Sequence, residues 1–212
     1  MRKFTLIFLL ASFMISLSAQ EAKTLFTNIP DSLAPLLSSV NRLDFIDFLD
    51  SNMKARVTNK FGGESEMTVL TDTYIHIKMT SQSSWQMKVL PVDSLNSIIC
   101  VVSTACAPVC NSTVRFYSTD WQELPVAPLL TLPVEDDFYK KPAQEEQLYE
   151  YDQLRKKADI FLVKAELSAD DEKLSFTYTT PDYVGSEDRE SYDLYIHSSL
   201  LFEWAGGKFV QL

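Results

Sequence analysis

The sequence predicts an α+β fold of mainly antiparallel sheets with a few helices, arranged as two sheet-centred lobes. Three observations support this class: short segments alternate apolar and polar residues, the spacers between them are short, and each half also holds a helical pattern. Alternation with period two is typical of strands, and short spacers favour antiparallel pairing. We expect an N-terminal lobe over residues 20–124, a Pro-rich acidic connector over 125–142 and a C-terminal lobe over 143–212.

The first residues have the layout of a secretory signal peptide, which we expect over residues 1–19. A basic start is followed by an apolar run over residues 4–17 and by small residues that favour a cut after Ala19. The apolar run is shorter than the roughly 20 residues that span a bilayer. A lipoprotein signal would need a cysteine after the cut, where Gln20 stands. We therefore expect an exported, soluble chain that is not inserted in a membrane.

The overall charge excludes two classes of partner. The 212 residues carry a net charge of −10, and cleavage would remove two more positive charges, those of Arg2 and Lys3. A basic footprint for nucleic acid is missing, and so is the cationic helix face of a membrane-binding protein. We expect neither partner, and interpret the acidity as a means of keeping the protein soluble.

In the first half, Pro30-Asp31-Ser32 opens a short helical turn, and Asn41 is then expected to cap a helix that runs to about Met53. Residues at helical spacing should form its inner stripe, Leu43, Ile46, Leu49 and Met53, and Phe45 and Phe48 should widen it. Strands are expected around residues 74–79, 85–89, 98–102 and 114–117. Residues 98–102 are apolar without alternation, as in a central strand covered on both faces. These strands should pair as an antiparallel meander.

In the second half, the connector carries four prolines and an acidic run that starts at Glu135. A polar helix is expected over residues 145–157, with acids at its start and bases at its end, as the helix dipole favours. Strands over 161–167 and 174–178 should form one hairpin. A further helix is expected from Ser186 to about Ile196. Residues 200–210, around Gly206-Gly207, should close the chain as a second hairpin.

The chain has three cysteines, of which two are expected to form a disulfide. Cys106 and Cys110 enclose a short turn between two strands, and an oxidising compartment favours their bond. Cys100 lies in an apolar strand and is interpreted as a buried small residue. Structural zinc would need four ligands, and neither histidine is near the cysteines in sequence. Free thiols are the alternative to the disulfide.

Five segments carry a resemblance to a known family: Ile29–Leu33, Asn41–Asp44, Gly62–Thr68, Phe116–Trp121 and Glu203–Phe209. Together they resemble a family of exported proteins from Bacteroides-type gut bacteria, catalogued as domain of unknown function 3256. The resemblance covers nearly the whole mature chain. It implies a location in the periplasm or at the cell exterior of a Gram-negative bacterium, and it brings no activity with it.

The same resemblance suggests O-glycosylation, because exported proteins of such bacteria can carry glycans at Asp-Ser followed by an apolar residue. Ser32, in Asp31-Ser32-Leu33, and Ser94, in Asp93-Ser94-Leu95, are similar to this pattern. A three-residue pattern often occurs by chance, and Asp31-Ser32 also has a structural interpretation as a helix start.

Motifs for catalysis and for metal binding are missing from the sequence. A Ser-His-Asp arrangement needs a histidine base, whereas His76 falls on the polar face of a strand and His197 at a junction of elements. Gly-x-Ser-x-Gly elbows, two-histidine zinc helices and calcium loops do not occur. We therefore expect no catalytic residue, cofactor or metal. A carboxylate pair for hydrolysis leaves no sequence signature, because the fold sets its geometry.

The candidate contact residues are Trp121 and Tyr183, which fall in expected loops. Aromatic rings with a polar tip suit contacts with partners or sugars, although packing over a sheet edge is the alternative for Trp121. The leading hypothesis is a non-enzymatic exported protein that binds an envelope protein or a glycan through a sheet face or edge loops. The alternatives are an extracytoplasmic hydrolase of glycans or peptides and a structural subunit of an envelope assembly.

Overall fold

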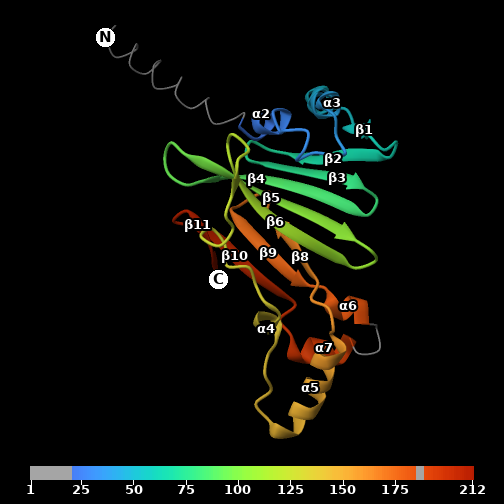
Figure 1. The fold of residues 1–212 in the computed structure, drawn as a ribbon, viewed down its shortest axis with the longest axis vertical. Helices are drawn as coiled ribbons and strands as arrows, with labels where there is room; N and C mark the ends of the chain where they lie inside the picture. The colour runs from blue at the N-terminus through green and yellow to red at the C-terminus, as the bar shows by residue number, and fades with distance from the viewer. Residues whose placement is uncertain (1–20, 185–188) are drawn as a thin grey trace, which may run out of the picture.

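Two antiparallel sheets dominate the computed structural model, which describes residues 21–184 and 189–212. The first sheet has seven strands in the order β1-β2-β3-β4-β5-β6-β7, and the second has four strands in the order β11-β10-β9-β8 (Figure 1). The order follows the chain in the first sheet, which confirms the expected meander and the α+β class. The expected signal peptide and Ser186, the expected helix start, lie outside the described residues.

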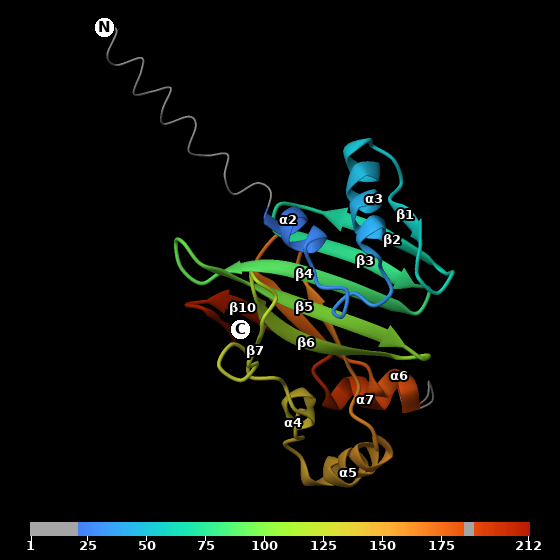
Figure 2. The same ribbon diagram turned by 45° about the horizontal axis from the view of Figure 1, so that its top comes forward.

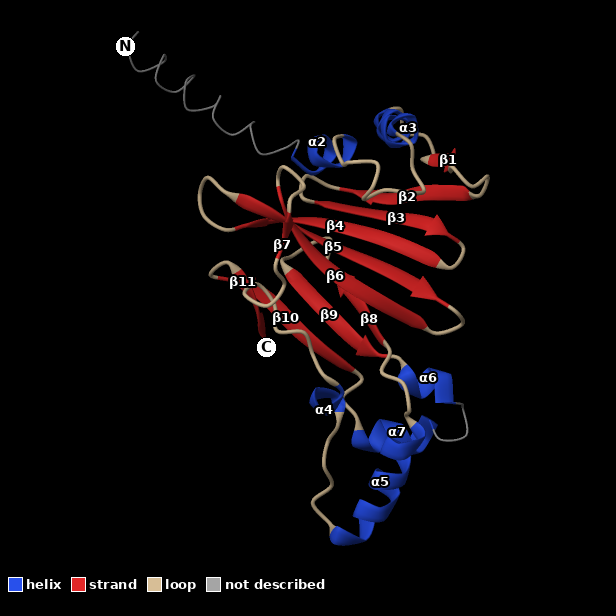
Figure 3. Cartoon of the chain, in the orientation of Figure 1, coloured by secondary structure: helices blue, strands red, loops and turns tan. Residues whose placement is uncertain are grey.

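The strands of the first sheet are β1 (Arg56–Thr58), β2 (Glu64–Leu70), β3 (Tyr74–Thr80), β4 (Ser83–Pro91), β5 (Ser97–Cys106), β6 (Cys110–Ser118) and β7 (Glu123–Leu124). Those of the second are β8 (Val163–Leu167), β9 (Lys173–Tyr178), β10 (Ser199–Ala205) and β11 (Lys208–Gln211). The helices, coloured blue in Figure 3, are α2 (Glu21–Thr27), α3 (Ser39–Asp50), α4 (Glu135–Phe138), the 3-10 turn η1 (Glu145–Gln147), α5 (Leu148–Lys157), α6 (Thr180–Val184) and α7 (Arg189–Tyr195). The boundaries of two lobes stay a prediction.

The central strands β4 and β5 of the seven-stranded sheet are buried on both faces, because their successive side chains enter different cores. On β4, Met87 packs with α2 and α3, whereas Leu90 belongs to the core shared with the four-stranded sheet. Figure 2 shows α2 and α3 over one face, and the four-stranded sheet lies on the other side. Residues 98–102 of β5 are all buried, which confirms the expected central strand.

Helix α3 starts earlier than predicted and buries only part of its expected inner face. Ser38 is the N-cap: its hydroxyl accepts the Asn41 N–H, and the Ser38 N–H donates to the Asn41 side chain. The prediction that Asn41 caps the helix was wrong, because in this reciprocal capping box Asn41 is the third helical residue. Phe45 and Ile46 are buried as expected, whereas the expected inner residues Leu43 and Met53 are each 53% exposed.

The Pro-rich stretch over residues 125–142 contains more structure than a plain connector. Its acidic run forms α4, where the Val134 N–H donates to the Asp137 carboxylate. Leu130 and Phe138 are buried, and the Phe138 ring stacks on Tyr178 with 5.2 Å between centroids. The segment therefore contributes to the core while it links the two sheets.

A disulfide joins Cys106 and Cys110 at the turn between β5 and β6, the pair that the sequence spacing favoured, and Cys100 is a buried free thiol. Reduction is expected to lower the free energy of unfolding by about 2 kcal/mol, because an open loop gives the unfolded chain more conformations. Urea unfolding with and without dithiothreitol measures the difference. The double variant Cys106→Ser/Cys110→Ser should match the reduced protein in both buffers. Equal stability of the oxidised and reduced wild type would contradict the expectation.

Candidate functional site

The four-stranded sheet meets the seven-stranded sheet along its edge strand β8. Alternate N–H groups of β8 point away from β9 and donate to side-chain oxygens of β4 and β6, at 2.9–3.1 Å: Val163 to Asn111 Oδ1, Ala165 to Ser112 Oγ and Leu167 to Gln86 Oε1. An edge strand is a template for pairing with other chains unless its backbone groups are covered. Side chains of the larger sheet cover these β8 donors.

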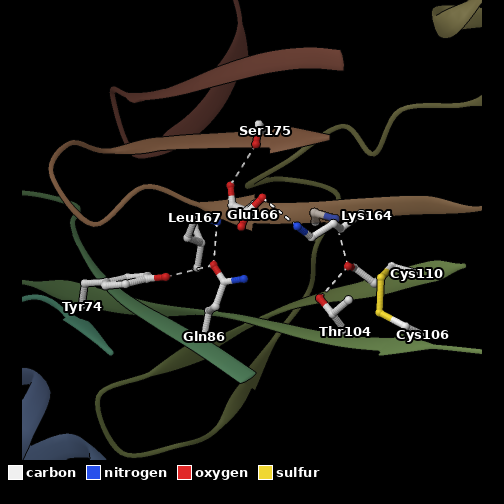
Figure 4. A network of polar contacts seen from close by, with 11 residues as sticks. Tyr74, Gln86, Thr104, Cys106, Cys110, Lys164, Glu166, Leu167 and Ser175 are labelled. Carbon is white, nitrogen blue, oxygen red and sulfur yellow. Dashed lines mark hydrogen bonds and ion pairs between the residues drawn. A yellow bond between two sulfur atoms is a disulfide. The ribbon is translucent and has the colours of Figure 1, made fainter. Parts of the chain in front are cut away.

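Gln86 is the most buried of these acceptors and is shared with Tyr74. Its Oε1 accepts the Leu167 N–H at 2.9 Å and the Tyr74 hydroxyl at 3.2 Å (Figure 4). Burial, with a smaller effect of Glu166, raises the pKa of Tyr74 to about 12, so the hydroxyl keeps its proton and donates. Lys88 donates to the carbonyls of Ser168 and Ala169 beyond the end of β8, and burial lowers its pKa. These hydrogen bonds join the two sheets, and we call the contact between β8 and the larger sheet the seam.

The outer side of β6 is different, because β7 covers only one end of it. The two residues of β7 pair with Phe116 and Tyr117. After β7, the Val126 carbonyl accepts the N–H groups of Leu129 and Leu130, so a turn leads the chain away from β6. Residues Ser112–Arg115, which we call the open edge, have no strand partner on this side within the described residues.

The direction of each backbone group in the open edge follows from its neighbours. Backbone groups alternate sides along an antiparallel strand, and the Ser118 N–H donates to the Gln122 carbonyl on the β7 side. The N–H and C=O groups of Ser112 and Val114 therefore point outward, whereas those of Thr113 and Arg115 point to β5. Within residues 21–184 and 189–212, nothing bonds to the outward backbone groups of Ser112 and Val114.

Two hollows flank the open edge, one on each side of the seven-stranded sheet. The inter-sheet hollow has a volume of about 480 Å³ and is lined by Asn111, Ser112, Thr113, Val114, Arg115, Glu123, Val126, Leu132, Pro133, Phe161, Val163 and Phe176. The helix-side hollow has about 280 Å³ and is lined by Ile29, Ser32, Leu33, Trp85, Val101, Ser103, Thr113, Arg115, Tyr117 and Trp121. Thr113 and Arg115 line both, so the open edge separates one hollow from the other.

Comparison with known proteins gives a family for this fold. A family model described as "Protein of unknown function (DUF3256)" matches residues 14–209. The chain belongs to this family. A solved structure of a domain of an uncharacterised protein from Porphyromonas gingivalis W83 is similar, with a TM-score of 0.79 and 24% identity over 91% of this chain and 98% of that chain. A match at 24% sequence identity establishes only that the two proteins share a fold. No curated protein matches the chain.

Two residues singled out in the sequence lie together at the helix-side hollow of this DUF3256 member: Trp121 and Ser32. Trp121 is buried in the turn before β7, with a positive φ of 60°. Its indole N–H donates to the Leu25 carbonyl at 3.0 Å, and its ring lies 5.5 Å from the Tyr117 ring. Its polar tip therefore ties the turn to α2, and a ligand contact by Trp121 stays a prediction.

The other predicted residues lie elsewhere in the fold. Tyr183 belongs to α6 rather than to a loop, and 52% of it is exposed. Ser94 is exposed in the turn between β4 and β5, where the Asp93 carboxylate accepts the N–H groups of Leu95 and Asn96. Glycosylation of Ser32 and Ser94 stays a prediction. The open edge was missed, although Pro125, directly after the last strand residue of the first half, was a signal that pairing stops there.

Glycoside hydrolysis needs a carboxyl group that keeps its proton, whereas the two acids that line one hollow of the described residues are each paired with a lysine. Glu166 and Asp171 line one hollow of about 300 Å³. Lys164 Nζ lies 3.0 Å from Glu166, and Lys173 Nζ lies 2.6 Å from Asp171. The hydrogen bond from Lys173 holds the pKa of Asp171 below its usual value, whereas a general acid needs a raised one. Among the described residues, no three His, Cys, Asp or Glu side chains are placed to hold a metal ion.

The described helices include none that is long and apolar enough to cross a membrane.

Proposed function

We propose that the protein is an exported, non-enzymatic binding module that holds the apolar groups of its ligand in the inter-sheet hollow. One observation carries the proposal: unpaired backbone groups of β6 open onto a hollow of about 480 Å³ with apolar walls. Sites for small ligands have volumes of roughly 300–1,000 Å³ and combine apolar walls with a few placed polar groups. The inter-sheet hollow has both features.

The walls of the hollow come from both sheets and from the segment between them. Val114 and Phe176 supply a buried floor, and Leu132 and Phe161, which are 48% and 38% exposed, stand at its sides. An ion pair of Arg115 with Glu123, with 3.7 Å between Nη1 and Oε1, adds charge at the β7 end. A ligand with apolar groups gains by covering Leu132 and Phe161, because each withdraws apolar surface from water.

Export is supported by the signal-like layout of residues 1–19 and by the disulfide, since such bonds persist in oxidising compartments. At the hollow that holds Glu166 and Asp171, each carboxylate is paired with a lysine, which does not favour the general acid that the hydrolase alternative needs.

The neutral fluorophore N-phenyl-1-naphthylamine tests the hollow. We expect saturable binding with enhanced fluorescence, and a dissociation constant about tenfold higher for Leu132→Asp, because a charged wall loses the roughly 1.5 kcal/mol of apolar contact. Leu95→Asp, at an exposed position outside the hollow, is the matched control and should bind as the wild type does. Equal binding by Leu132→Asp and wild type, or no binding by the wild type, would overturn the proposal.

A further inference from the structure

We infer that the ligand of the inter-sheet hollow is an extended segment of another polypeptide, which adds an antiparallel strand to the open edge of β6. This inference rests on the proposed function and names the class of ligand. Ser112 and Val114 present two N–H donors and two C=O acceptors along one line. A peptide main chain carries donors and acceptors at this spacing, and strand addition is an established mode of peptide recognition.

The length of the docked segment is set by what lies at each end of the open edge. At one end Leu124 of β7 already pairs with Phe116. At the other end the Thr179 hydroxyl donates to the Cys110 carbonyl at 2.7 Å. The free positions between them are those opposite residues 112–115, so four ligand residues occupy the edge. The antiparallel direction continues that of β7.

The two faces of the edge give the ligand an alternating pattern. The side chains of Ser112 and Val114 point to the four-stranded sheet, so the ligand residues opposite them enter the inter-sheet hollow and are apolar. The residues opposite Thr113 and Arg115 face the helix side and are polar. Arg115 is exposed, and its carboxylate partner Glu123 is as far as 3.7 Å away. An acidic ligand residue opposite Arg115 therefore complements its charge.

The peptide acetyl-Glu-Leu-Thr-Val-Thr-amide has this pattern: its Glu lies opposite Arg115, its Leu and Val lie opposite Val114 and Ser112, and its last Thr extends beyond the four edge positions. In an antiparallel pair, the N–H groups of the Leu and Val point to β6 and those of the two Thr residues point away. N-methylation of the Leu and Val is expected to weaken binding at least about tenfold, since two hydrogen bonds to β6 are lost. N-methylation of the two Thr residues should leave the affinity within about threefold.

Isothermal titration calorimetry of the wild-type protein measures its affinity for the unmodified peptide and for the two N-methylated peptides. Displacement of N-phenyl-1-naphthylamine by the peptide shows that it binds at the inter-sheet hollow. A lower affinity for the peptide with methylated Leu and Val, but not for the peptide with methylated Thr, supports strand addition. Strand addition would be overturned by equal affinity for both methylated peptides, or by a lower affinity only for the peptide with methylated Thr. It would also be overturned if the wild type binds no peptide while Leu132→Asp still weakens binding of the fluorophore. That last result leaves the proposed function standing and indicates a small apolar ligand. A wild type that does not bind the fluorophore would instead overturn the proposed function itself.

Discussion

Replacement of Phe116 with alanine is expected to lower the free energy of unfolding by about 4 kcal/mol, the typical cost of removing a buried phenylalanine ring. Phe116 is fully buried on β6, and its ring lies 6.4 Å from that of Trp204 and 6.3 Å from that of Phe209. Both neighbours belong to the four-stranded sheet, so the ring joins the two sheets. Urea unfolding followed by tryptophan fluorescence measures the change.

Phe61→Ala is the matched control, because Phe61 is exposed and its truncation should change stability by less than about 0.5 kcal/mol. A loss below about 1 kcal/mol for Phe116→Ala would show that the two sheets do not share this core.

Gln86→Leu is expected to cost about 3 kcal/mol, because two buried donors lose their acceptor at once. The Leu167 N–H and the Tyr74 hydroxyl both donate to Gln86 Oε1, and a buried unsatisfied group costs about 1–3 kcal/mol. Tyr74→Phe removes one donor and leaves the other bond intact, so it should cost about 1 kcal/mol. Urea unfolding of both variants gives the comparison, and equal losses would contradict this description of the seam.

The sheet could be predicted from sequence because its signal is local. Alternation in β3 and β6, and the continuous apolar run of β5, depend on residues that are neighbours in the chain. The disulfide followed from a turn of three residues between Cys106 and Cys110. Each of these inferences needs only a few consecutive residues.

Features that depend on several local signals together, or on distant residues, were missed or displaced. The start of α3 depends on a reciprocal pair between Ser38 and Asn41, in which either residue alone is a suitable cap. Trp121 was placed correctly in a turn, but its partner, the Leu25 carbonyl, is 96 residues away in sequence. No local pattern identifies such a partner.

The candidate site was beyond sequence prediction for the same reason. The open edge exists because β7 is only two residues long, and the bond of Thr179 to the Cys110 carbonyl sets its other end. The edge of β8 differs from that of β6, because side chains of Asn111, Ser112 and Gln86 accept its outward N–H groups. Proteins usually protect exposed edges in such ways. An edge left open beside an apolar hollow is therefore the feature of this fold that most favours binding.

Amide hydrogen exchange along β6, followed by NMR, tests this account most directly. Thr113 and Arg115, whose backbone groups pair with β5, should be protected in the free protein, whereas Ser112 and Val114 should exchange rapidly. Addition of acetyl-Glu-Leu-Thr-Val-Thr-amide should slow the exchange of Ser112 and Val114 at least about tenfold and leave Thr113 and Arg115 unchanged. Protection of all four amides in the free protein, or unchanged exchange of Ser112 and Val114 at saturating peptide, would contradict the account.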